Sequence, residues 1–144
     1  MELLLMRAEL ETLDRAHREA VDALSAADAI LRDAMRGPLT HDAHRRQHAD
    51  VLLRLARARR LAGLDGVGTL DEARAVAESV GALALVAQCD AELAEAAELQ
   101  GDRRAAVSAW RRAALNARAA GDAGLEQQFE ERLRRLTRFE PAPA

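Results

Sequence analysis

Three histidines at the spacing of a helical metal site are the clearest candidates for chemistry in this sequence. His41, His44 and His48 are separated by steps of three and four residues, which places them on one face of a helix. Such a face can bind a transition metal. Asp42 lies off that face, however, and no cysteine or nearby glutamate completes a ligand set. The pattern favours solvated histidines near a helix start over a metal site, and no cofactor is expected.

The patterns that carry catalysis or phosphate binding are missing from the sequence. It contains no HExxH motif, no Gly-rich phosphate loop that follows a strand, and no nucleophile elbow. Residues 63–68 are Gly-rich but lie between two expected helices. Cys89 is the only cysteine, which excludes an internal disulfide and a cysteine metal cage, and its apolar neighbours predict a buried, inert thiol. We therefore expect that the protein is not an enzyme.

Two arginine clusters raise the possibility of nucleic-acid binding. The first comprises Arg54, Arg57, Arg59 and Arg60, and the second comprises Arg132, Arg134, Arg135 and Arg138. The first cluster has no aromatic neighbour for base stacking, and Glu130 and Glu131 precede the second at pairing distance. The net charge of −3 gives no general attraction to nucleic acid or to a membrane. Solvated faces or ion pairs between helices are the better interpretation, with a nucleic-acid-associated regulator as an alternative.

The residue types favour helices throughout the chain. Hydrophobic residues make up 49% of the 144 residues and aromatic residues only 2%. Ala and Leu, which predominate, have the highest helix propensities, whereas strands favour β-branched and aromatic residues. An all-α fold is therefore expected, and disorder is not. No apolar run approaches the ~20 residues that span a bilayer, and residues 3–6 are too short for a signal-peptide core, so we expect a cytoplasmic protein.

Gly and Pro residues divide the chain into six expected helices. These are residues 2–35, 41–62, 70–80, 82–100, 102–120 and 122–138, followed by a flexible tail over 139–144. Thr40 can cap the second helix, and residues 69–72 read as a capping box for the third. Thr12 could likewise cap a new helix and split the first in two. One continuous first helix is favoured because nothing near Thr12 forces a turn.

Two parts of the chain repeat each other. Residues 55–63 align with residues 93–101, with apolar and small positions matched and charged positions of opposite sign. The segments that follow share steps of five, four and three residues, in Gly68, Ala73, Ala77 and Val80 and in Gly101, Ala106, Trp110 and Ala113. Each helical hairpin would bury only part of its apolar surface, so the hairpins are expected to stack. Trp110, with the largest apolar surface of the chain, is expected in the core.

The small residues and the aromatic at these positions resemble a tetratricopeptide repeat. Residues 101–122 are also similar to the helical sensor modules of bacterial MalT-like regulators. The resemblance covers residues 87–120 best and 48–85 less closely, since Ala77 stands at the aromatic position. It implies one domain over 1–138, a right-handed solenoid with an N-terminal helix (1–36), repeats at 41–80 and 82–120, and a capping helix at 122–138. Gln127 and Gln128 depart from the repeat pattern in that last segment.

The resemblance also implies a function, the binding of a protein or peptide in a concave groove. Carried over position by position, the groove lining would be Asp50, Leu53, Arg57, Arg60, Gln88, Ala91, Glu95, Glu98, Leu125, Phe129 and Arg132. The alignment places Arg57 and Arg60 opposite Glu95 and Glu98. Two interpretations are open: the arginines pair directly with the glutamates, or they bind an acidic ligand. A chaperone-tail clamp is not expected, because the chain has no Lys at groove positions. The alternative is a sensor or oligomerisation segment of a larger regulator.

The first helix carries an apolar stripe of its own. Its members are Leu3, Leu4, Leu5, Met6, Leu10 and Leu13. A continuous helix over 2–35 would be ~50 Å long and the next only ~33 Å, so the N-terminal end must overhang its neighbour. We expect the exposed stripe to pack against a second copy or a partner helix. If the chain instead turns near Thr12, the stripe would fold back onto the stack.

Overall fold

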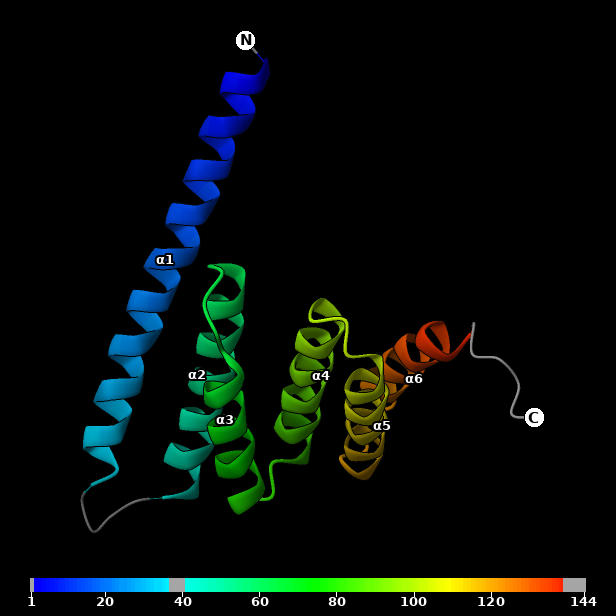
Figure 1. Ribbon diagram of the computed structural model, residues 1–144. Helices are drawn as coiled ribbons and strands as arrows, with labels where there is room; N and C mark the ends of the chain where they lie inside the picture. The colour runs from blue at the N-terminus through cyan, green and yellow to red at the C-terminus, as the bar shows by residue number, and fades with distance from the viewer. Residues whose placement is uncertain (1, 37–40, 139–144) are drawn as a thin grey trace.

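The computed structural model describes residues 2–36 and 41–138, with side chains from residue 4 onward. Helices fill both ranges, and no strand occurs in them (Figure 1). The helices are α1 (Glu2–Ala34), α2 (Asp42–Leu61), α3 (Val67–Ser79), α4 (Leu83–Leu99), α5 (Arg103–Ala119) and α6 (Ala123–Thr137). The predicted all-α fold of about six helices is confirmed. In these ranges no helix combines the length and the apolar character that a membrane crossing requires.

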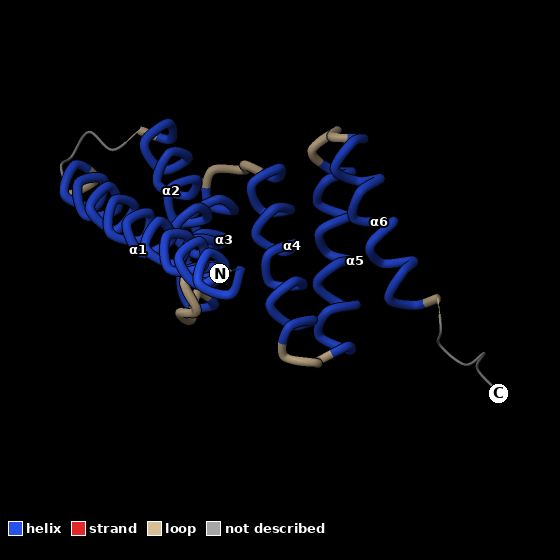
Figure 2. Tube along the Cα trace, turned by 90° about the horizontal axis from the view of Figure 1, so that it is seen from above, coloured by secondary structure: helices blue, strands red, loops and turns tan. Residues whose placement is uncertain are grey.

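The helices form a row in which each packs on its neighbours in the chain. The main contacts join α1 to α2, α2 to α3, α3 to α4, α4 to α5 and α5 to α6, and only α2 and α4 add a further one. Figures 1 and 2 show this row from two directions, with the N-terminus at one end and α6 at the other. Successive helices run in opposite directions, so the architecture is a stack of helical hairpins.

The last two turns of the stack use the same Gly-Asp dipeptide. Gly101 and Gly121 have φ values of 75° and 74°, a conformation in which glycine is the least strained residue. The aspartates that follow them cap the next helices: Asp102 accepts a hydrogen bond from the backbone N–H of Ala105 and Asp122 from that of Leu125. Each dipeptide thus ends one helix and starts another, as the sequence breaks predicted.

The third helix begins three residues earlier than predicted, and the predicted capping box is wrong. Gly66 is the residue before α3, with no side-chain cap, and Thr69 lies inside the helix. A Cβ atom at Gly66 would lie 2.6 Å from the carbonyl oxygen of Ala56, so this close approach to α2 fixes where α3 can start. Glu72 pairs with Arg32 of α1 instead of capping its own helix. Thr40 lies outside the described residues.

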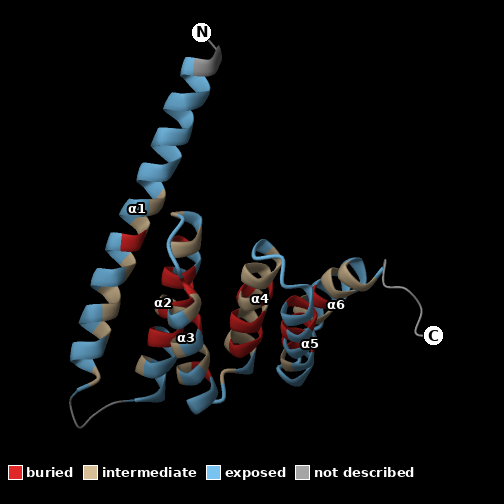
Figure 3. Cartoon of the chain, viewed as in Figure 1, coloured by how far each residue is buried: buried red, intermediate tan, exposed pale blue. Residues whose placement is uncertain are grey.

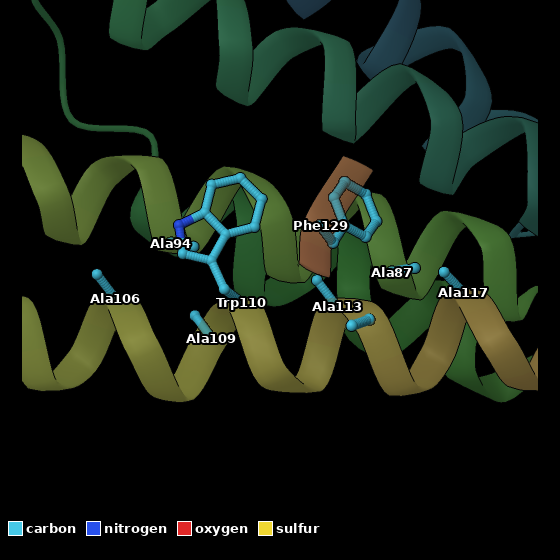
Figure 4. Packing of buried hydrophobic residues seen from close by; sticks show 9 residues of the cluster. Ala87, Ala94, Ala106, Ala109, Trp110, Ala113, Ala117 and Phe129 are labelled. Carbon is cyan, nitrogen blue, oxygen red and sulfur yellow. The ribbon is translucent and has the colours of Figure 1, made fainter. Parts of the chain in front are cut away.

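The two largest of the four buried clusters in the described residues lie along the stack from α2 to α6. The larger joins α4, α5 and α6 around Trp110, which is 1% exposed and is surrounded by alanines and Phe129 (Figure 4). The smaller joins α2, α3 and α4 around Leu52, Leu70 and Cys89. Alanines at the contact surfaces allow the helices to approach closely. The prediction that Trp110 lies in the core is confirmed.

The first helix is continuous, and only its C-terminal half packs on the stack. The hydroxyl of Thr12 donates to the carbonyl oxygen of Ala8, a bond inside the helix rather than a cap. Val21 packs with Leu55 and Ala58 of α2, whereas the N-terminal half is exposed (Figure 3). The alternative in which the chain turns near Thr12 and folds back is therefore wrong.

Candidate functional site

A groove lies between α4 and α6, with α2 at one side. Its volume is about 520 Å³. Its lining consists of Arg57, Gln88, Ala91, Glu92, Glu95, Trp110, Leu125, Gln128, Phe129, Glu131, Arg132 and Arg135. Four of these residues, Ala91, Trp110, Leu125 and Phe129, are apolar and the other eight are polar or charged. The groove therefore combines a small apolar floor with a polar rim, and both can contribute to binding a ligand.

Seven of the residues predicted to line a groove do so. They are Arg57, Gln88, Ala91, Glu95, Leu125, Phe129 and Arg132. Arg60 and Glu98 line an adjoining hollow that shares Glu95 and Arg132. Leu53 is buried in the α2–α3–α4 core instead, because both later helices cover that face of α2. Asp50 pairs with Arg54 one turn along α2 and also lies outside the groove.

The floor of the groove is built on Trp110. Its indole N–H donates to the Glu98 carboxylate at 3.0 Å, which satisfies the only polar atom of a buried side chain. The Phe129 ring lies 5.7 Å from the indole, centroid to centroid. The Arg132 guanidinium stands 4.8 Å from the centre of the same ring, within the range of a cation–π contact. Helices α4, α5 and α6 are therefore joined at one aromatic residue.

Ion pairs cross the groove from α2 to α4 and from α4 to α6. Arg57 Nε lies 2.8 Å from a Glu92 oxygen, and Arg60 reaches both Glu92 at 2.9 Å and Glu95 at 2.7 Å. Arg132 of α6 contacts Glu98 at 3.2 Å. The expected Arg60–Glu95 pairing is present, but the partner of Arg57 is Glu92 and the partner of Glu98 is Arg132. The alignment missed Glu92, which lies one turn before Glu95 on the same face of α4.

Two side-chain amides at the rim of the groove form no hydrogen bond with other described residues. Gln88 of α4 and Gln128 of α6 both line it, and neither amide has a hydrogen-bond partner within residues 4–36 and 41–138. Gln128 is exposed and Gln88 half-buried. Each amide offers both donors and an acceptor, so together they can bond to a backbone placed between α4 and α6.

Behind the groove lies a buried carboxylate that sequence reasoning missed. Asp90 of α4 is fully buried. It accepts hydrogen bonds at 2.8 Å from both Arg74 of α3 and Asn116 of α5, and Arg112 lies 3.5 Å away. The hydrogen bond with Asp90 raises the pKa of Arg74 above its usual value, against the opposing effect of burial. This network fixes α4 between its two neighbours.

The three histidines do not behave alike. His48 is buried, and its Nε2 lies 2.6 Å from Asp28 of α1, so the prediction of a solvated residue is wrong there. The rings of His41 and His44 lie 5.7 Å apart. Within the described side chains, no group of three His, Cys, Asp or Glu residues is placed to hold a metal. The one polar partner of His48 is supplied by another helix, which spacing along α2 cannot reveal.

Asp28 lies at the α1–α2 contact, where its neighbours stabilise its charged form. Burial alone would raise its pKa, but hydrogen bonds from Arg32 and His48, together with their charges, hold the pKa below its usual range. Arg32 also pairs with Glu72 of α3. The network thus links α1, α2 and α3.

Cys89 is buried, as predicted. Burial, with a smaller contribution from the negative charge of Asp90, raises the pKa of its thiol to about 12. The reactive thiolate is therefore suppressed at neutral pH.

Every member of the two arginine clusters except Arg138 pairs with a group inside the described part of the chain. In the first, Arg59 donates to the carbonyl oxygen of Asp65, and the other three pair with acids of α2 and α4. In the second, Arg134 and Arg135 both pair with Glu131, and Arg132 pairs with Glu98. This agrees with the interpretation of the clusters as ion pairs.

Comparison with models of protein families, with curated proteins and with solved structures finds no match to this chain.

Proposed function

We propose that the protein is a non-enzymatic interaction module that binds an extended segment of a partner protein in the groove between α4 and α6. The observation that carries this proposal is the pair of unengaged amides, Gln88 and Gln128, at the rim of an apolar floor. Polar groups left free beside an apolar surface are what a peptide-binding groove uses to hold a backbone.

The charges at the groove favour a segment that is neutral and carries an apolar side chain. Arg57 and Arg132 are already paired with glutamates, so an acidic ligand would have to break existing ion pairs. Leu125, Phe129 and Ala91 offer an apolar surface for one anchoring side chain, the usual source of most binding energy. The same pairing argues against nucleic acid, whose binding depends on free cationic groups.

A regulatory role in the cytoplasm of a bacterium belongs to the same proposal. It is supported by the resemblance of residues 101–122 to the helical sensor modules of bacterial regulators and of the two repeats to tetratricopeptide repeats. Proteins of this architecture use their groove for recognition rather than catalysis.

Selection from a random peptide library against the whole chain, followed by NMR mapping of a selected peptide, tests the proposal. We expect shifts concentrated at Gln88, Ala91, Leu125 and Phe129. Shifts centred on the outer face of α5, around Arg111 and Leu115, would contradict it. Salt provides a second readout, because affinity for a neutral segment changes little between low and moderate ionic strength.

A further inference from the structure

The apolar face by which α1 packs on α2 continues past the end of α2. The better-covered positions of α1 recur at steps of three and four, at His17, Ala20, Leu24, Ala27 and Leu31. The same steps lead back to Leu13, Leu10 and Met6, which are 53%, 63% and 58% exposed. Steps that alternate between three and four are those of a coiled-coil seam. One half of this seam is therefore occupied by α2 and the other half is open.

The open half begins where α2 ends. Ala62, the residue that follows α2, packs against the same cluster as Ala20 and Leu24 of α1. Residues 2–17 therefore extend beyond the end of α2, a length of about 24 Å. Figure 1 shows this overhang rising above the ends of α2 and α3. Leu61 and Leu64, 53% and 47% exposed, also lie at that end of α2, but they line hollows on its α4 side.

We propose that the overhangs of two copies of this chain pack against each other as an antiparallel helical pair. An antiparallel pair joins two overhangs of equal length along their whole seam, with Leu13 of one copy against the partner's Met6 and the Leu10 residues of both copies near the middle. The seam is thus covered by an identical surface, as in a twofold symmetric dimer.

The position of α2 selects this orientation. Since α2 and the open seam share one face of α1, a second α1 placed in parallel would run into α2 along residues 20–31. An antiparallel partner helix extends in the opposite direction, away from α2. The two helical stacks then lie at opposite ends of the pair. The groove between α4 and α6 lies on other helices and remains free in the dimer.

Light scattering of the whole chain tests the association. We expect a particle of twice the 15.6 kDa of one chain, and a single-chain mass for Leu10→Glu/Leu13→Glu. The matched control, Ala8→Glu/Thr12→Glu, adds the same charges to exposed positions off the seam and should remain a dimer. A wild type that is monomeric at high concentration, or a seam variant that stays dimeric, would overturn the proposal. Circular dichroism should show equal helix content in all three proteins, because the substituted positions are exposed; a seam variant that unfolds would also overturn it.

Spin labels decide the orientation. Asp22 is exposed on α1, and a label on Asp22→Cys should give an interchain distance of roughly 40 Å in the antiparallel pair, from 1.5 Å per residue along the axis. A parallel pair would place the labels well under about 30 Å apart, given helix axes ~10 Å apart. The shorter distance would overturn the antiparallel arrangement.

Discussion

Asn116 of α5 donates a 2.8 Å hydrogen bond from its Nδ2 to Oδ2 of the fully buried Asp90 in α4. The other oxygen of Asp90 is held by Arg74 from α3. A buried carboxylate is tolerated only while its partners remain, because its hydration is lost. The contact therefore joins three helices through one charge.

Removal of Arg74 should destabilise the stack strongly. Arg74→Met leaves Asp90 without its closest cation, and we expect a loss of roughly 3 kcal/mol in the free energy of unfolding. Arg104→Met is the matched control, since Arg104 is exposed on α5 and should change stability by less than about 0.5 kcal/mol. Urea unfolding followed by circular dichroism measures both. Equal midpoints for the two variants would contradict the role of Asp90.

Truncation of Trp110 should separate packing from hydrogen bonding. Trp110→Ala is expected to cost roughly 3–5 kcal/mol of unfolding free energy, as for other buried aromatics. Trp110→Phe keeps a six-membered aromatic ring but loses the N–H bond to Glu98 and the volume of the five-membered ring, so its cost should be smaller than that of Trp110→Ala. Chemical denaturation of both variants provides the measurement. A wild-type midpoint for Trp110→Ala would show that the indole does not support the core.

Acid should weaken the contact of α1 with the stack. The folded-state pKa of Asp28 is lowered, so the stability it contributes is fully present above its unfolded pKa of about 4 and is lost as the pH falls through the lower, folded value. Asp28→Asn should therefore flatten the acid limb of a stability–pH curve. Its control, Asp33→Asn, changes an exposed aspartate of α1 and should leave that limb unchanged. The same acid limb in Asp28→Asn and the wild type would argue against the network with Arg32, His48 and Glu72.

Cys89 should report on unfolding. With a pKa of about 12 and no exposure, the thiol should be unreactive toward alkylating reagents at pH 8 in the folded protein and react at once in denaturant. A second cysteine at the exposed position Ala105→Cys provides the control and should react in the folded state. Rapid labelling of Cys89 in the native protein would mean that the α2–α3–α4 core opens readily.

The parts of this molecule that depend on local pattern could be predicted from the sequence. Gly101-Asp102 and Gly121-Asp122 set their turns by backbone conformation and capping, which neighbouring residues alone determine. The resemblance to the repeat family also carried Gln88, Ala91 and Glu95 to the groove, because these α4 positions follow helical spacing along one face.

What depends on contacts between distant helices could not be predicted. His48 looked solvated because its partner, Asp28, lies in a different helix. Leu53 was assigned to the groove because the alignment did not show that α3 and α4 both cover it. Asp90 looked like any acid of an amphipathic helix, although α3 and α5 enclose it completely. Whether a polar side chain is buried depends on all the helices that pack around it. The sequence of its own helix therefore does not reveal its burial.

The most direct test of the proposed groove is a titration of the selected peptide into two adjacent glutamine variants. Gln128 lines the groove, whereas Gln127 does not, so Gln128→Ala and Gln127→Ala remove the same chemical group from neighbouring positions of one helix. We predict that Gln128→Ala weakens binding about tenfold, as for the loss of hydrogen bonds to a peptide backbone, and that Gln127→Ala stays within about twofold of the wild type. Equal affinities for both variants, or a larger loss for Gln127→Ala, would contradict binding between α4 and α6.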